Sequence, residues 1–142
     1  MDLLLILRDA LASSLVGGLL FAIEARRTGR TVAVFFTQEA LAALAQGSFE
    51  WPRELSGQAM RLSLADRAKE KGLPILGRGE GRQIDAKAIV SQAKEAGVAL
   101  YACPEWSALL SLDGRLPDGV EALDSAGALK LIEDARRVIG SL

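Results

Sequence analysis

Short, continuous apolar segments are the feature that most constrains how this chain folds. Residues 2–8, 31–37 and 98–102 read DLLLILR, TVAVFFT and VALYA. Apolar runs of about 4–8 residues that are rich in β-branched and aromatic side chains are typical of strands buried on both faces. Segments with helical periodicity separate these runs, and strands that alternate with helices predict a parallel sheet covered by helices on both sides. The sequence therefore predicts an α/β protein.

Capping residues and glycines predict where the helices begin and end. We expect Asp9 to cap a helix that ends near Arg27, and the glycine pair Gly17-Gly18 within it indicates a close approach to the sheet. Residues 73–84 contain glycines at three alternate positions and are expected to form a mobile loop, with a short edge strand over 74–76 as the alternative. A capping box at Ser63 and Asp66 predicts a helix over 63–71, and Ser125 is expected to cap a helix over 125–139 with Val138 and Ile139 on its apolar stripe. Further helices are expected over 38–46, 85–96 and 104–112, and a further strand over 120–123.

The composition narrows the class of protein. Half of the 142 residues are hydrophobic and no linker or repeat divides them, so we expect a single domain over 1–142. With 17 basic and 18 acidic residues, the net charge of −1 gives no reason to expect nucleic-acid binding. The first apolar segments are interrupted by Asp2, Arg8 and Asp9, which predicts neither a signal peptide nor a membrane span.

One cysteine and no histidine limit the possible chemistry. A single cysteine excludes an internal disulfide and favours the reducing cytoplasm. The absence of histidine excludes Ser-His-Asp and Cys-His catalysis and zinc sites built on imidazole. The carboxylates show no metal-ligand spacing, so we expect neither a metal nor another cofactor.

A candidate site follows from the ends of the expected strands. Ligand sites in open parallel sheets lie beyond the carboxyl ends of the strands. Those ends are followed here by Arg8-Asp9, Thr37-Gln38, Cys103 and Asp124-Ser125. Because Asp, Ser and Thr also cap helices, each of them taken singly is explained by capping alone.

Cys103 is the strongest candidate, since a thiol is not a favoured cap. It lies between a strand and a helix that begins at Pro104, where unpaired N–H groups around Trp106 favour a thiolate. Asp9, Thr37, Gln38 and Trp106 are weaker candidates for contacts around the sulfur. Glu105 is expected to face water, because a carboxylate beside the sulfur opposes a thiolate. The alternative is that Cys103 is a buried packing residue.

Other segments carry weaker signals. The run GRGEGR at 77–82 lacks the strand-to-helix context of a phosphate loop and is not expected to bind phosphate. Phe49 and Trp51 lie in an expected loop and are a candidate surface for self-association.

The segment GVALYACP at 97–104, followed by a turn and a short strand at 120–123, resembles the DsrE/DsrF-like sulfur-relay family, whose members include proteins labelled peroxiredoxin-like. The apolar first strand and the VxVFFT strand at 32–37 agree with it, and only 48–84 match poorly. The resemblance implies a flavodoxin-like three-layer sandwich with a mostly parallel sheet of four to five strands, assembled into homo-trimers or hexamers. It also implies that Cys103 carries a persulfide between donor and acceptor proteins, as in a sulfurtransferase.

Two other functions stay open. Some members of the family lack the cysteine, so a non-catalytic subunit or a module that binds a small ligand is the alternative. A flavin- or nucleotide-binding protein is the least favoured, because Arg8-Asp9-Ala10 is not a phosphate loop. A thiol peroxidase with an internal resolving cysteine is disfavoured by the single thiol.

Overall fold

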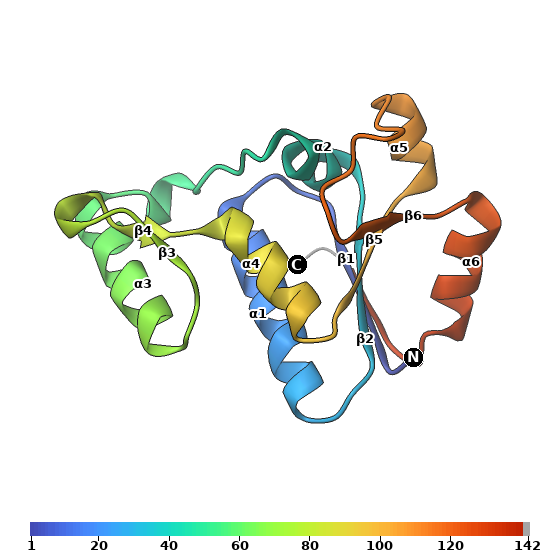
Figure 1. Ribbon diagram of the computed structural model, residues 1–142, viewed down its shortest axis with the longest axis horizontal. Coiled ribbons are helices and arrows are strands. Elements are labelled where there is room, and N and C mark those ends of the chain that lie inside the picture. The colour runs from blue at the N-terminus through green and yellow to red at the C-terminus, as the bar shows by residue number, and fades with distance from the viewer. Residues whose placement is uncertain (141–142) are drawn as a thin grey trace.

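Five parallel strands form the central sheet of the computed structural model, which describes residues 1–140 (Figure 1). The strands lie in the order β6-β5-β2-β1-β7. Their bounds are β1 (Leu3–Leu7), β2 (Val32–Phe36), β5 (Ala99–Ala102), β6 (Val120–Ala122) and β7 (Val138–Gly140). The protein is thus an α/β sandwich of the flavodoxin-like class, as the sequence predicts.

Helices cover the two faces of the sheet in the way that handedness requires. The helices α1 (Ala12–Arg27) and α4 (Ala86–Glu95) lie side by side on one face, and α6 (Ser125–Asp134) lies on the other (Figure 1). The chain reaches β2 and β5 by moving across the sheet in one direction, and then returns from β6 to β7 in the opposite direction. Because such crossovers are right-handed, the return connection must pass over the opposite face. The remaining helices of the body are α2 (Gln38–Gln46) and α5 (Pro104–Leu109).

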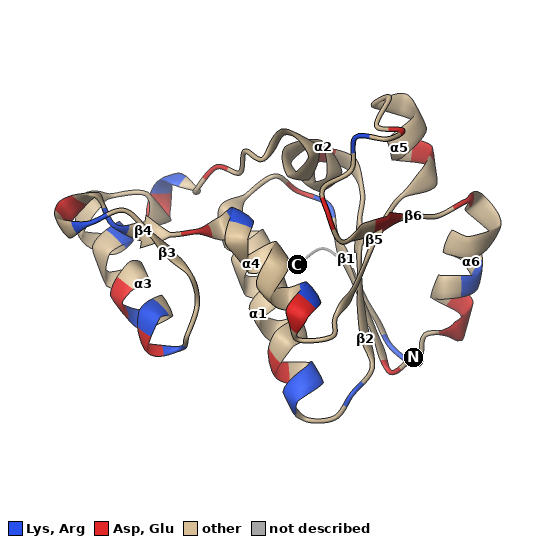
Figure 2. Ribbon diagram, viewed as in Figure 1, with Lys and Arg blue, Asp and Glu red and all other residues tan. Residues whose placement is uncertain are grey.

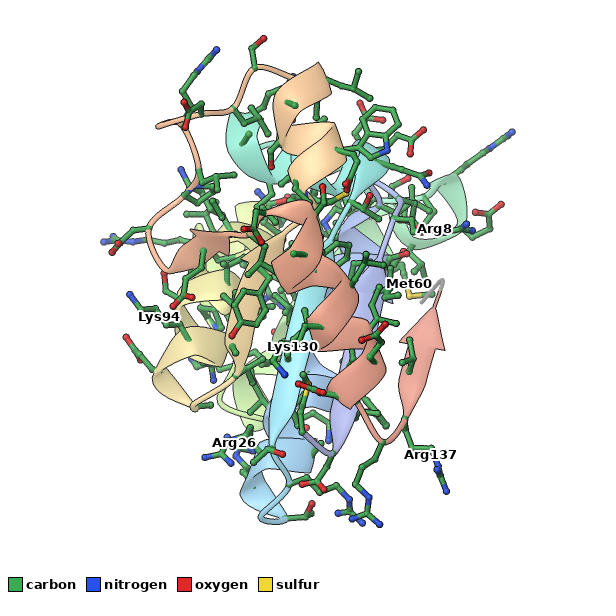
Figure 3. All side chains as sticks on the ribbon, turned by 90° about the vertical axis from the view of Figure 1, so that its right-hand side faces the viewer. Arg8, Arg26, Met60, Lys94, Lys130 and Arg137 are labelled. Atoms are coloured by element: carbon green, nitrogen blue, oxygen red, sulfur yellow. The ribbon has the colours of Figure 1, made fainter. Side chains whose placement is uncertain are left out.

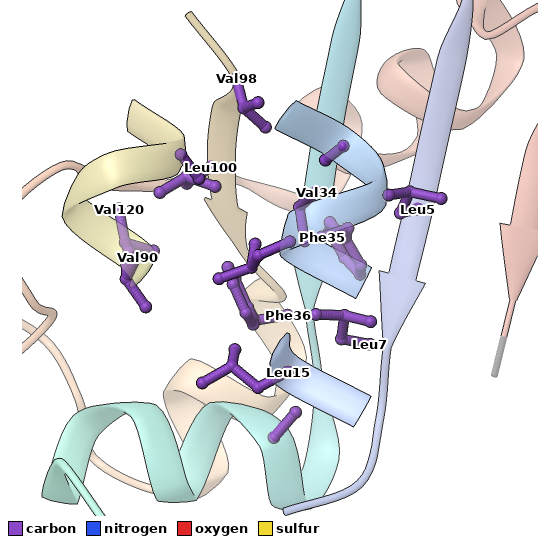
Figure 4. Packing of buried hydrophobic residues seen from close by; sticks show 14 of the residues in the cluster. Leu5, Leu7, Leu15, Val34, Phe35, Phe36, Val90, Val98, Leu100 and Val120 are labelled. Carbon is purple, nitrogen blue, oxygen red and sulfur yellow. The ribbon is translucent and has the colours of Figure 1, made fainter. Parts of the chain in front are cut away.

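The core lies between the sheet and the pair α1 and α4. In the register of the strands Leu7 pairs with Phe36 and Phe36 with Ala102, so their side chains share one face. Phe36 is completely buried there, together with Leu15 of α1 and Val90 of α4 (Figure 4). This continuous apolar layer holds the carboxyl ends of β1, β2 and β5 at one edge.

The close approach predicted for the glycine pair occurs at Gly18. A Cβ atom built on Gly18 would lie 2.8 Å from Leu7 Cδ2, whereas one on Gly17 would meet nothing within 4 Å. The expected cap is displaced: α1 begins after Leu11, and Asp9 accepts hydrogen bonds from Leu11 N and Ser14 Oγ, both at 2.9 Å. Asp9 therefore fixes the turn that leads into the helix.

The C-terminal segment corrects the expected long helix. Helix α6 ends at Asp134, and Val138 and Ile139 belong to β7, where they pair with Leu4 and Leu5 of β1. Without β7, the backbone N–H and C=O groups along the outer edge of β1 would stay unpaired. Pairing these groups stabilises the segment more than burying a helical apolar stripe would. The cap also differs, because Asp124 and not Ser125 accepts a hydrogen bond from Gly127 N, at 2.7 Å.

Residues 53–84 form a projecting arm, seen at the left of Figure 1. It contains α3 (Gln58–Glu70) and an antiparallel hairpin of β3 (Ile75–Leu76) and β4 (Gln83–Ile84), with 3-10 turns at Arg53–Leu55 and Gly79–Gly81. The helix thus begins before the expected start at Ser63. The expected loop over 73–84 is a hairpin instead, stabilised by Arg82, whose guanidinium donates to both carboxylate oxygens of Asp66 at 2.8 and 3.1 Å.

Two further observations concern the surface. Phe49 and Trp51 are half-buried and pack against the core, so they do not form the exposed patch that their loop position suggested. Among residues 1–140, no helix has both the length and the apolarity needed to cross a bilayer.

Candidate functional site

The polar residues that follow the strands meet at one edge of the sheet, as predicted. Thr37 N donates to the Leu7 carbonyl at 3.1 Å, and Cys103 N donates to the Phe36 carbonyl at 2.9 Å. These bonds extend the parallel ladder by one step, so Arg8, Thr37 and Cys103 lie on neighbouring strands at the same level. Cys103 follows β5, with β2 on one side and β6 on the other.

Cys103 is the N-cap residue of α5, but its sulfur makes no capping bond. The backbone carbonyl of Cys103 accepts from Ser107 N at 2.9 Å, and Pro104 occupies the first helical turn. The side chain forms no hydrogen bond with the helix N–H groups. The expectation that the N–H groups around Trp106 hold the sulfur is therefore wrong for this state of the protein, in which Cys103 is 7% exposed.

The partner of the sulfur is Glu105. The Cys103 thiol donates to Glu105 Oε2 at 3.4 Å, and the Ser125 hydroxyl donates to Glu105 Oε1 at 2.7 Å. Glu105 is exposed, as expected, but its carboxylate turns back toward the sulfur and does not face only water. These three side chains form the candidate site.

The electrostatics of the site follow from these hydrogen bonds. The Ser125 hydroxyl, the backbone N–H of Glu105 and the Cys103 thiol hold the pKa of the Glu105 carboxyl below its usual value of 4.5. The carboxylate is therefore charged at neutral pH. This charged carboxylate accepts the S–H hydrogen bond of Cys103.

Ser125 is the functional residue whose role the sequence does not reveal. It follows Asp124 at the start of α6, and α6 contacts α5. Twenty positions separate Ser125 from Glu105, and only the packing of α6 against α5 brings them together. No local motif signals this contact, because a serine at a helix start has a sufficient explanation as a cap.

The other predicted site residues follow β1, β2 and β5 at the same edge of the sheet, and within residues 1–140 they make no hydrogen bond to the sulfur. Thr37 is buried at the carboxyl end of β2, and Trp106 is half-buried against the core. Asp9 is occupied by the turn before α1. Among the hydrogen bonds described for residues 1–140, none joins the Sγ atom to these side chains or to Gln38.

Gln38 carries backbone strain beside the site. Its φ of 53° lies in the left-handed region, which a residue with a side chain seldom adopts. Such conformations persist where the surrounding structure enforces them, and they concentrate at functional sites. The strain lies between β2 and α2, and β2 is the neighbour of β5, the strand that precedes Cys103.

A comparison with solved structures places the fold. The crystal structure of the YchN protein from E. coli matches with a TM-score of 0.59, covering 99% of this chain and 100% of that one, at 18% sequence identity. The chain shares the fold of that structure. No family model matches the sequence, and no curated protein matches it.

Proposed function

We propose that this protein carries sulfane sulfur as a persulfide on Cys103, receiving it from a donor protein and passing it to an acceptor. The observation that supports this most is the position of the chain's single thiol. It lies at the carboxyl edge of a DsrE/DsrF-like sheet, and its S–H group donates a hydrogen bond to an exposed carboxylate. Ligands of open parallel sheets bind at this edge, and the carboxylate places the thiol next to the protein surface.

The atoms and electrons of the sulfur transfer balance with Cys103 as the single thiol of the carrier. Cys103 loses its proton to water, and the thiolate attacks the terminal sulfur of the donor persulfide. A new S–S bond forms on Cys103 while the donor's S–S bond breaks, and the departing donor thiolate takes up a proton from water. In the second step an acceptor thiolate attacks the terminal sulfur of the Cys103 persulfide, and Cys103 leaves as a thiolate that takes up a proton from water. No external oxidant, metal or organic cofactor enters either step.

Glu105 would control the resting state of this carrier. Its carboxylate accepts the S–H hydrogen bond of Cys103, and a protonated thiol oxidises more slowly than a thiolate. The thiol then reacts mainly where a partner changes the charge around Glu105. This arrangement suits a carrier that must receive sulfur from one partner and not from any oxidant in its compartment, which we propose to be the cytoplasm.

The test is to load the native protein with a low-molecular-weight persulfide and weigh it intact. We expect a gain of one sulfur atom per chain, which dithiothreitol removes, and no gain for Cys103→Ser. Labelled sulfur should then pass to an acceptor thiol with loss of the mass from Cys103. Native protein that gains no sulfur, or Cys103→Ser that gains the same mass, would show that the proposal is wrong.

One observation favours a second candidate, a non-catalytic subunit. Cys103 is buried and belongs to the hydrophobic core cluster, as a packing cysteine would. In that case iodoacetamide would modify the native thiol only as fast as the chain unfolds. Modification that is much faster than unfolding would instead support the carrier, since unfolding of small domains is slow.

A further inference from the structure

We infer that the arm of a second copy of this chain docks on the acidic face around α5 and α6, where it places a Lys or Arg side chain beside Glu105. The acidic face is the surface of residues 104–134. The inference rests on the proposed function for its consequence, because the incoming cation would change the state of the Cys103 thiol. Its physical basis is independent, and lies in the charge and apolar surface of the two regions.

The two regions have opposite charges. Residues 53–84 carry seven Lys or Arg and four Asp or Glu, whereas residues 104–134 carry two Lys or Arg and seven Asp or Glu. The chain as a whole is almost neutral, at −1. Figure 2 shows basic segments on both the helix and the hairpin of the arm. The near-neutral total therefore conceals a net charge of about +3 on the arm and about −5 on the acidic face, which favours docking between them.

The charges concerned are available for a partner. Among residues 1–140, the ion pairs include neither Lys69 nor Arg78 of the arm, and neither Glu105 nor Glu121 of the acidic face. Lys69 and Arg78 line one hollow between α3 and the hairpin. Two cations on one surface attract a matching anionic surface more strongly than scattered charges do.

Apolar side chains accompany the charges on both regions. Leu76 of the arm is 51% exposed, and Leu109 and Leu129 of the acidic face are 73% and 61% exposed. A contact between the two regions would bury these side chains while it pairs the charges around them. Such an apolar centre with a polar rim is the usual composition of a protein interface.

The arm of the same chain does not reach the acidic face. The arm and α6 lie at opposite ends of the molecule (Figure 1). A second copy supplies the missing partner, because every copy carries both a basic arm and an acidic face. Closed symmetric assemblies satisfy all such contacts, and an assembly of this kind is what the proposed trimers or hexamers require.

The consequence falls on the candidate site. A Lys or Arg that pairs with Glu105 weakens the hold of this carboxylate on the Cys103 proton, and the cation itself favours a thiolate. The site of an isolated chain is then incomplete, because within residues 1–140 the charged group that hydrogen-bonds to its sulfur is an anion. The assembled form would be the more reactive one.

The first test reverses the charges. Lys69→Glu with Arg78→Glu should weaken self-association by about tenfold or more in sedimentation velocity. Glu121→Lys with Glu133→Lys should do the same. Mixing the two variants should restore association between unlike variants, because each then offers the charge that the other lacks. Arg30→Glu with Arg137→Glu, at the amino ends of the strands, is the control and should assemble as the natural chain does. Circular dichroism checks that each variant is folded.

The second test locates the contact. Carbodiimide treatment of a mixture of ¹⁴N and ¹⁵N protein should join Lys69 or Lys71 of one copy to Glu105 or Glu121 of another. A natural chain that is monomeric at all concentrations, variants that assemble unchanged, or cross-links only elsewhere would overturn the inference. Persulfide loading is measured on the same samples. Failure to load would overturn the proposed function and leave the assembly result standing.

Discussion

The Cys103 sulfur lies 3.4 Å from Glu105 Oε2 and donates its hydrogen bond to this oxygen. The contact joins the end of a buried strand to the exposed surface of a short helix. It gives the sulfur a carboxylate partner in place of the backbone N–H groups at the start of α5. Glu105 is thus the residue through which the surroundings act on the sulfur, and four predictions follow from this contact and from the fold that positions it.

Replacing Glu105 by glutamine should make the thiol more reactive. The amide keeps an acceptor for the S–H group but removes the negative charge that opposes a thiolate. We expect alkylation of Cys103 by iodoacetamide at pH 7 to become severalfold faster, roughly threefold or more. Glu95→Gln at the end of α4 is the control, because it removes an exposed carboxylate that lies outside the acidic face and has no bond to the sulfur. An unchanged or slower rate in Glu105→Gln would contradict this interpretation of the contact.

Removing the Ser125 hydroxyl should raise the pKa of Glu105. The hydrogen bond from Ser125 is the largest cause of the lowered pKa of this carboxyl. In Ser125→Ala, the pKa of Glu105 should move up toward 4.5, which a ¹³C NMR titration of the side-chain carboxyl would show. Ser91→Ala, on the exposed side of α4, is the matched control. A pKa of Glu105 that is the same in Ser125→Ala and in the natural chain would exclude this role.

The adjacent glycines of α1 should respond oppositely to alanine. At Gly17 a methyl group meets open space, so the higher helix propensity of alanine should stabilise the protein by about 0.5–1 kcal/mol. At Gly18 the methyl group would press against the buried Leu7 side chain, and overpacking should destabilise it by about 1–3 kcal/mol. Urea unfolding measures both changes. Equal effects of the two substitutions would show that α1 does not pack closely on β1.

The contact between Asp2 and Thr31, just before β1 and β2, should make the protein sensitive to acid. The backbone N–H of Thr31, its hydroxyl and Arg136 lower the pKa of Asp2 from its usual 3.8. Between that lowered pKa and 3.8, the unfolded chain binds more protons than the folded one, so stability falls as the pH falls through this window. In Asp2→Asn this part of the pH dependence should disappear from urea midpoints measured between pH 2 and 5. Identical slopes for the two proteins would contradict it.

The basic side chains of the central body differ in position and in use from those of the arm. Arg26 and Arg137 lie at the amino ends of the strands, whereas Arg8 lies near their carboxyl ends (Figure 3). Arg26 is bonded to the carbonyls of Ala96 and Arg30 and so ties the end of α1 to that of α4. The arm is different, since among residues 1–140 no ion pair includes its Lys69 or Arg78.

The sequence by itself determined the α/β class, the buried strands, and the edge at which Cys103 lies. Each of these follows from local patterns: continuous apolar runs, alternation with helices, and a cysteine directly after a strand. Asp85 caps α4 through Ala88 N, as a local motif predicts. Such features depend on neighbours within a few positions, and the sequence displays those neighbours directly.

Only the tertiary structure decided the last strand and the partner of the sulfur. Val138 and Ile139 fit a helical stripe equally well, and the open edge of β1 selected the strand. Ser125 and Glu105 meet because α6 returns across the sheet to reach β7 and packs against α5 on its way. Contacts between distant segments depend on strand order and crossover direction, and a local pattern contains no information about either.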